Sequence, residues 1–152
     1  MYILGLNAYH GDSSACIFKD NKLVAAIEEE RIRRIKHWAG FPSESIKFCL
    51  GECDISIQDV DHITISRDPS ANIYKKITHS IKHAVSLKVL KDRFKNTRKV
   101  NSVKQELSNV FSINEAEIKA EVHNIEHHRS HMASAFFASP FEDSAILSID
   151  GF

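Results

Sequence analysis

The order of its first apolar runs constrains the fold of this chain more than any other feature. Residues 2–7 form an apolar, strand-like run, and two more such runs, 14–19 and 22–28, follow a short polar loop. The junction between these two is Asp20-Asn21, and Asx residues in a two-residue junction are typical of a tight β-hairpin turn. The chain therefore opens with a buried strand, a loop and a hairpin before any helix begins.

Strand-like and helical runs alternate through the rest of the chain. Ser43 precedes an apolar stripe at helical spacing and is predicted to cap a helix. The further predicted elements are a strand, a long helical stretch, a strand, a helix ended by a proline, and a last strand, over residues 62–66, 72–111, 120–125, 126–139 and 145–149. This order favours an α/β fold with a mixed sheet and flanking helices.

The charge and the apolar pattern exclude several classes of protein. Lysine plus arginine and aspartate plus glutamate both number 20, so the formal net charge is zero and provides no global field toward nucleic acid or a membrane. No apolar run approaches membrane-spanning length, and the first residues lack the basic flank and cleavage site of a signal peptide. We expect the three cysteines to be reduced thiols in a cytoplasmic protein that has no membrane partner.

The one strong charge asymmetry lies in residues 72–104, which carry ten lysines and arginines against a single acid, Asp92. A solvated helix face explains such a stretch, and an anion-binding surface is the alternative. We favour the solvated face and expect no nucleic-acid partner.

Histidines near the C-terminus form the strongest local signal. His127 and His131 stand four apart on the predicted helix, so both rings can point at one centre. Two imidazoles at this spacing suit a first-row metal, and Asp150, at the end of the last predicted strand, could supply a third ligand. Such a set leaves open positions for substrate oxygens. A chance histidine pair and an ordinary Asp-Gly turn fit the same spacing, which alone does not decide between these interpretations.

Two further segments could bind an anion. The loop over residues 7–14 is rich in small hydroxyl residues, and could present backbone N–H groups and the hydroxyls of Ser13 and Ser14 to a phosphate. It lacks the glycine and lysine pattern of a P-loop, and its aspartate and serines are also ordinary turn formers. The basic run from Arg31 to His37 could neutralise phosphate or carboxylate groups, or pair at solvent with the acids before it.

Together these blocks resemble the carbamoyltransferase family that includes the nodulation and antibiotic-tailoring O-carbamoyltransferases. They stand in the order of the family's first strand and loop, its glutamate-arginine and lysine-histidine segment, and its metal motif, and they span nearly the whole chain. The matching residues are Ile3 to Asn7, His10, Ser13 to Ala15, Glu28 to Arg31, Arg34, Lys36, His37, Phe41, Pro42, His127, His128, His131, Ser134 to Phe137, Ser139 to Glu142, Asp150 and Gly151.

The resemblance implies an actin-like ATPase (ASKHA) fold, which also occurs in the tRNA threonylcarbamoyl-transfer proteins, with ATP and a divalent metal, often iron, between two related halves. Residues 1–140 would form the first half of this nucleotide- and metal-binding domain, and residues 141–152 the incomplete first strand of the second half. Carbamoyl phosphate would be broken down in a separate C-terminal domain. Carbamate would then react with ATP to give carbamoyl adenylate, which carbamoylates the hydroxyl of a sugar, antibiotic or other metabolite.

The resemblance also implies roles for single residues. His127, His131 and Asp150 match metal ligands. His10 matches a histidine close to the transferred group, where an imidazole could act as the general base for the acceptor hydroxyl. Lys36 matches a lysine near the carbamoyl adenylate, where its charge would offset that of the phosphate.

The loop carries the remaining assignments and one departure from the family. Ser13 and Ser14 are expected to contact the nucleotide. His10 is followed by Gly11-Asp12, whereas many relatives place the aspartate directly after the histidine, so Asp12 receives no role.

Two other functions stay open. A threonylcarbamoyl transferase acting on tRNA shares the fold and the His-x-x-x-His pair, and the stretch 72–104 could bind RNA phosphates, but the glutamate-arginine segment favours the O-carbamoyltransferase. A non-catalytic metal- or nucleotide-binding module is the third candidate. Because the second half and the carbamoyl-phosphate domain would lie beyond residue 152, we expect the chain alone to be inactive, and its last strand to promote self-association through an apolar edge.

Overall fold

The computed structural model describes residues 1–68 and 103–149. The predicted helical stretch over 72–111 therefore falls largely outside the described residues, as do nearly all of its basic side chains. In chain order the elements are β1 (Tyr2–Asn7), β2 (Ser14–Lys19), β3 (Lys22–Glu28), α1 (Glu29–Arg33), α2 (Ser43–Glu52), the short 3-10 helix η1 (Ile57–Asp59), β4 (His62–Ile65), α5 (Val103–Phe111), the 3-10 helix η2 (Glu115–Glu117), β5 (Glu121–Asn124) and α6 (His127–Phe137).

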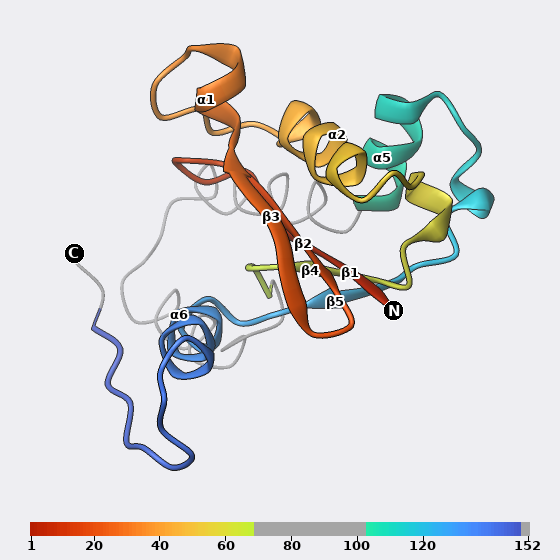
Figure 1. Cartoon of the computed structure of the whole chain (residues 1–152). Coiled ribbons are helices and arrows are strands. Elements are labelled where there is room, and N and C mark those ends of the chain that lie inside the picture. The colour runs from red at the N-terminus through yellow and green to blue at the C-terminus, as the bar shows by residue number, and fades with distance from the viewer. Residues whose placement is uncertain (69–102, 150–152) are drawn as a thin grey trace, which may run out of the picture.

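A five-stranded mixed sheet with the order β3-β2-β1-β4-β5 forms the centre of the molecule (Figure 1). The β1-β2 and β2-β3 pairs are antiparallel, and the β1-β4 and β4-β5 pairs are parallel. The φ angles of Asp20 and Asn21 are 49° and 64°, the left-handed turn conformation that short Asx side chains tolerate. The hairpin predicted from this dipeptide is therefore confirmed.

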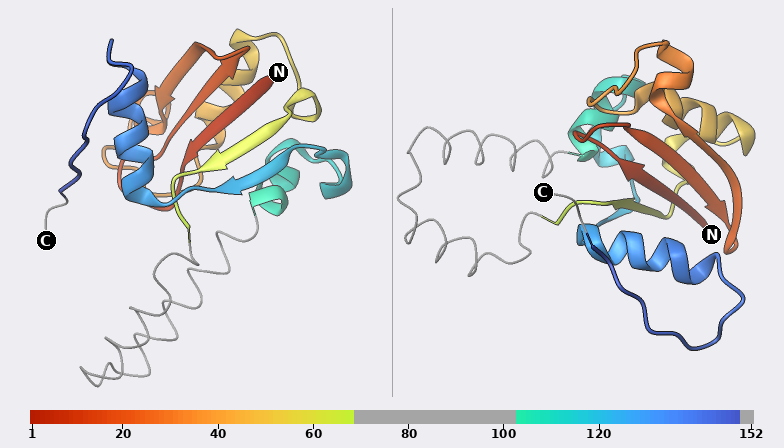
Figure 2. Two further views of the ribbon diagram at one scale, coloured as in Figure 1. Left: turned by 90° about the horizontal axis from the view of Figure 1, so that it is seen from below. Right: turned by 90° about the vertical axis from the view of Figure 1, so that its left-hand side faces the viewer.

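One face of the sheet carries the hydrophobic core. Successive side chains of a strand point to opposite faces, and Leu4 of β1 and Ile63 of β4 are both fully buried on the core side. They belong to one cluster with Ile46 of α2 and Leu107 of α5. Figure 2 shows these two helices on one side of the sheet and α6 on the other.

The predicted α/β class with a mixed sheet and flanking helices is confirmed. The strands predicted over 62–66 and 120–125 and the helix predicted over 126–139 correspond to β4, β5 and α6 with slightly narrower bounds. Within the described part of the chain, no helix combines the length and the apolarity that crossing a membrane requires.

Two local predictions are wrong. Ser43 does not cap α2, because Pro42 occupies the cap position and a distant glutamate binds the first N–H groups of the helix. Residues 145–149 form no strand, and Leu147 and Ile149 are each 81% exposed. Strand backbone groups need partners on a neighbouring strand, and none of the described strands pairs with this segment. The domain boundary expected at residue 140 stays a prediction.

Candidate functional site

The rings of His127 and His131 meet at the start of α6. Glu126 caps this helix, because its carboxylate accepts hydrogen bonds from the backbone N–H groups of Arg129 at 3.0 Å and His128 at 3.2 Å. The Arg129 bond above all holds the pKa of Glu126 below its ordinary value. One helical turn separates the two rings, whose Nε2 atoms lie 3.1 Å apart with the ring planes at 90°. The two ring nitrogens therefore face one another, and a metal shared between them stays a prediction.

His10, in the loop between β1 and β2, lies beside this pair. The centroid of its ring is 5.8 Å from that of His127, and its Nδ1 is 3.3 Å from the carbonyl oxygen of Gly11. The imidazole is exposed. Two segments that are far apart in the sequence therefore meet, although the roles predicted for their histidines stay predictions.

The donor atoms of the α6 pair suit a transition metal. Two imidazole nitrogens bound to one ion at about 2.0–2.1 Å stand roughly 2.9 Å apart at the right angle of an octahedral site and roughly 3.4 Å apart in a tetrahedral site. The 3.1 Å between the Nε2 atoms of His127 and His131 lies between these values. Asp150, the third predicted ligand, lies outside the described residues. Ser148 precedes it by two positions, and the Oγ of Ser148 is 3.0 Å from Nδ1 of His128. The chain before Asp150 therefore runs against α6.

A pocket of about 590 Å³ is lined by residues of β1, β2, β3 and β4 and by Ser130 of α6. Gly5 is part of this lining. A Cβ atom at this position would lie 2.7 Å from the Sγ of Cys16, so a larger residue would collide with that thiol. Ser14, Arg31 and Ser130 of α6 line the sides of the pocket. The pocket thus offers hydroxyl groups and the guanidinium of Arg31, whose Nε is 3.2 Å from Oε2 of Glu28 in the same lining.

The two serines predicted to bind nucleotide are placed differently. Ser13 is fully buried, and its hydroxyl lies 2.8 Å from the carbonyl oxygen of Gly40 and 3.1 Å from that of His10. Its backbone N–H donates to the carbonyl of Trp38 at 2.9 Å. Ser14, by contrast, lines the pocket. Ser14 is therefore accessible to a ligand in the pocket, whereas the hydroxyl of Ser13 is bonded within the protein and stabilises the loop.

A buried carboxylate, Glu29, holds the same loop against α2. Glu29 is fully buried and accepts hydrogen bonds from Nε of Arg33 at 2.6 Å, the hydroxyl of Ser45 at 2.8 Å, and the backbone N–H groups of Glu44 and Ser45 at 3.1 and 2.7 Å. Its own N–H donates to the carbonyl of Ser13 at 2.8 Å. Burial alone would raise the pKa of Glu29, but these bonds outweigh it and hold the pKa below its ordinary value.

The lysine-histidine segment follows α1 and contacts the opening loop. His37 donates its backbone N–H to Oε2 of Glu30 at 3.0 Å, and its Nδ1 is 2.9 Å from Oδ1 of Asp12. The Asp12 carboxylate raises the pKa of His37. Lys36 is exposed, and within residues 1–68 and 103–149 no hydrogen bond or ion pair joins it to the histidines of the loop or of α6.

Comparison with known proteins gives one family and several relatives. The family described as "Carbamoyltransferase N-terminus" matches residues 2–152. The "Uncharacterized protein sll1178" of Synechocystis sp. is 36% identical over 160 residues, which cover 99% of this chain and 25% of that protein. The nodulation protein NolNO of Sinorhizobium fredii is 30% identical over 149 residues, which cover 95% of this chain and 20% of that protein. This chain therefore spans only a quarter or less of these two relatives.

Among solved structures, YeaZ from Pseudomonas aeruginosa matches with a TM-score of 0.47 and 14% sequence identity, over 90% of this chain and 48% of YeaZ.

Proposed function

This chain belongs to the carbamoyltransferase N-terminus family, as its motifs suggest, and we propose that the protein containing it is an ATP-dependent O-carbamoyltransferase. Carbamoyl phosphate and ATP are its co-substrates, and carbamoyl adenylate passes its carbamoyl group to the hydroxyl of a small-molecule acceptor such as a sugar or an antibiotic. The observation that carries this proposal is the meeting of His10 with His127 and His131, which brings a general-base candidate to a pair of metal-type ligands.

The proposed metal is a divalent ion, iron by the family resemblance, held by His127 and His131 with Asp150 as a third ligand. The 3.1 Å between the two Nε2 atoms supports this assignment. When bound, such an ion offsets negative charge on phosphate oxygens and on the developing oxyanion. The Glu126 cap contributes by fixing the first turn of α6, on which the first histidine stands.

His10 is the proposed general base. As the acceptor oxygen bonds to the carbamoyl carbon, the hydroxyl proton passes to the imidazole of His10. The bond between that carbon and the adenylate oxygen then breaks, and AMP leaves with its electron pair. An imidazole titrates near neutral pH and is therefore suited to this transfer. The exposure of the ring supports the assignment, because an acceptor can reach it.

The nucleotide phosphates are proposed to bind in the pocket beside Ser14 and Arg31, which line it. Lys36 is proposed to offset the phosphate charge of the carbamoyl adenylate, from a segment that the His37–Asp12 contact holds on the opening loop. Because the chain spans a quarter or less of its two relatives, we assign the rest of the nucleotide site and the carbamoyl-phosphate chemistry to further residues of the same protein.

Carbamoyl transfer by the longer protein that contains this chain tests the proposal. We expect carbamate-dependent exchange of pyrophosphate into ATP, and transfer to an acceptor from a panel of hydroxyl compounds. His10→Ala should lower turnover roughly 100-fold or more while ATP affinity changes little. Lys47→Ala is the matched control, because Lys47 is exposed and pairs only with Glu44 on the surface of α2 in the described residues.

Two outcomes contradict the proposal at different levels. Wild-type turnover in His10→Ala removes this residue from the chemistry but leaves the function standing. The absence of carbamate-dependent exchange in the wild-type protein, with its metal supplied, contradicts the function itself.

A further inference from the structure

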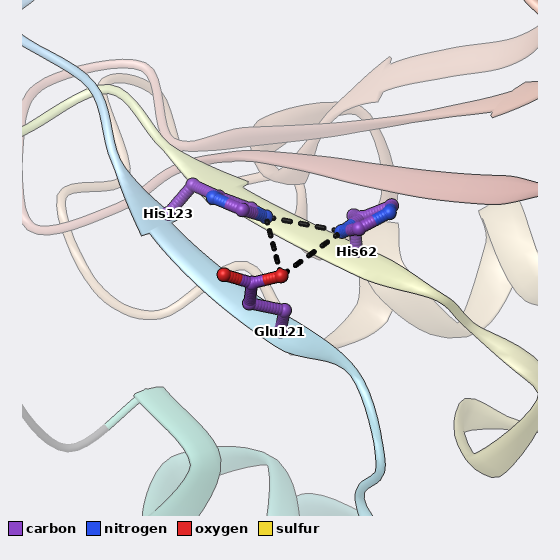
Figure 3. Close-up of side chains that lie close together, drawn as sticks. All are labelled: His62, Glu121 and His123. Carbon is purple, nitrogen blue, oxygen red and sulfur yellow. Dashed lines mark hydrogen bonds and ion pairs between the residues drawn. The ribbon is translucent and has the colours of Figure 1, made fainter.

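A second cluster of metal-type ligands lies on the sheet itself. His62 is the first residue of β4, and Glu121 and His123 belong to β5 (Figure 3). The parallel register aligns His62 with Glu121 and Thr64 with His123. Since alternate residues of a strand share a face, the three side chains emerge on the same side of the sheet, and Figure 3 shows them turned toward one another.

The ligand atoms of this cluster converge. Nδ1 of His62 is 3.0 Å from Nε2 of His123, and Oε2 of Glu121 is 4.0 Å from the first nitrogen and 3.9 Å from the second. The side chains of the two histidines are 35% and 36% exposed, whereas that of Glu121 is 71% exposed. The paired strands therefore hold the two rings half-buried, while the carboxylate keeps the freedom to move.

We propose that His62, Glu121 and His123 bind a divalent first-row cation of the Zn²⁺ type. Two imidazole nitrogens and one carboxylate oxygen are donors that Zn²⁺ takes, whereas Ca²⁺ and Mg²⁺ prefer oxygen ligands throughout. Tetrahedral bonds of about 2.0–2.2 Å place ligand atoms roughly 3.3–3.5 Å apart. The observed separations of 3.0 to 4.0 Å bracket this range, and a small rotation of the exposed glutamate shortens the two longer ones. The fourth position is left for water.

A proton is the competing occupant of this cluster. One imidazole can donate its N–H to the other, and the nearby carboxylate can then pair with an imidazolium. Zn²⁺ needs the lone pairs of both ring nitrogens, so the ion and that proton exclude one another.

The position of the cluster gives the ion a structural role. Among the described strands, β5 lies at one edge of the sheet, and α6 begins within three residues of its end. An ion shared by His62 of β4 and two residues of β5 crosslinks the two strands. Because α6 follows β5 directly, the ion also restricts the position of the start of α6. This role stands whether or not the proposed carbamoyl transfer is correct.

Zinc titration of the untagged full chain, freed of metal by a chelator, tests the second site. Isothermal titration calorimetry compares the wild type with two matched double variants, His62→Gln/His123→Gln and His127→Gln/His131→Gln. We expect the first variant to lose one Zn²⁺ equivalent at the sheet and the second to retain that equivalent. The same stoichiometry and affinity in the wild type and in His62→Gln/His123→Gln overturn the proposal.

A single substitution at an exposed ligand provides a second test, in case the double substitution on the sheet unfolds the chain. Glu121 is largely exposed, so Glu121→Gln should leave circular dichroism and thermal unfolding of the metal-free chain unchanged. Combined with His127→Gln/His131→Gln, which removes the α6 pair, it should lower the remaining Zn²⁺ affinity roughly 10-fold or more. Unchanged affinity overturns the proposal.

Discussion

Two polar clusters contact the loop between β1 and β2, and they differ in how their polar atoms are satisfied. The carboxylate of Glu29 is fully buried and accepts four hydrogen bonds. His10 and His131 are exposed, and the Nε2 atom of His131 faces that of His127 across 3.1 Å. A buried charge whose oxygens are fully bonded has no capacity left for a ligand, whereas a solvent-exposed imidazole such as that of His131 is accessible to one.

This difference distinguishes a residue that stabilises the fold from residues proposed to bind a ligand. Glu29 binds the loop through the carbonyl of Ser13 and caps α2 through Ser45, so its contribution is to stability. His10 and His131 are exposed, and the contribution that we propose for them is to ligand binding. Substitutions in the two clusters should therefore move different observables, and the predictions below are ordered by the expected size of the effect.

Glu29→Ala should produce the largest change in stability. It removes a buried acceptor, leaves the N–H groups of Ser45 and Glu44 without their partner, and takes from the guanidinium of Arg33 one of its partners, which costs roughly 2–4 kcal/mol of unfolding free energy. Urea denaturation monitored by circular dichroism measures this. Glu28→Ala is the control, since Glu28 pairs with Arg31 at the surface and should change stability by less than about 1 kcal/mol. Equal effects of the two substitutions would remove Glu29 from the scaffold.

Acid should weaken the fold partly through the same residue. The pKa of Glu29 is lower in the folded chain than its ordinary value of 4.5, so the unfolded chain binds the proton more readily. The stabilisation is therefore fully present above pH 4.5 and is lost as the pH falls through the folded pKa. Urea midpoints measured between pH 6 and pH 3 should fall less steeply in Glu29→Gln than in the wild type. Parallel curves for the two proteins would contradict this assignment.

The exposed cluster should respond in the opposite way. His131→Ala removes an exposed ring from α6 and should change the unfolding free energy of the metal-free chain by less than about 0.5 kcal/mol, while it abolishes metal binding at the pair. Thermal unfolding and metal titration of the same sample measure both quantities. A stability loss comparable to that of Glu29→Ala would mean that the histidines are also scaffold.

The smallest effect concerns the contact between the opening loop and the segment after α1. Asp12 raises the pKa of His37 above its ordinary value of 6.5, so the stability that this pair provides is present below that value and is lost as the pH rises through the folded pKa. Nuclear magnetic resonance titration of the imidazole protons should give a pKa above 6.5, and Asp12→Asn should lower it. An identical titration curve in the variant would rule out this contact in solution.

Local patterns predict the five strands of the sheet and the proximity of the two α6 histidines. The Asp20-Asn21 turn and the four-residue histidine spacing both depend on short-range geometry, which the sequence displays directly. Glu29 was missed because it stands inside a charge run that resembles a solvated face. The signal was nonetheless present, because Ala25 and Ile27 pack against the core and position 29 continues their alternation inward.

Long-range register could not be predicted in the same way. His62 and His123 become neighbours only because β4 and β5 pair in parallel with a particular alignment, and no local pattern specifies it. The apolar run over residues 145–149 illustrates the converse, because a strand-like composition produces no strand where no described neighbour pairs with it.

Anomalous scattering from crystals of the longer protein, grown with ferrous iron, tests most directly whether the exposed cluster is the metal centre. We predict an iron peak about 2.0–2.2 Å from the Nε2 atoms of both His127 and His131, and its loss in His131→Ala crystals. Wild-type crystals without a peak between these two rings, or an undiminished peak in the variant, would contradict this account of the site.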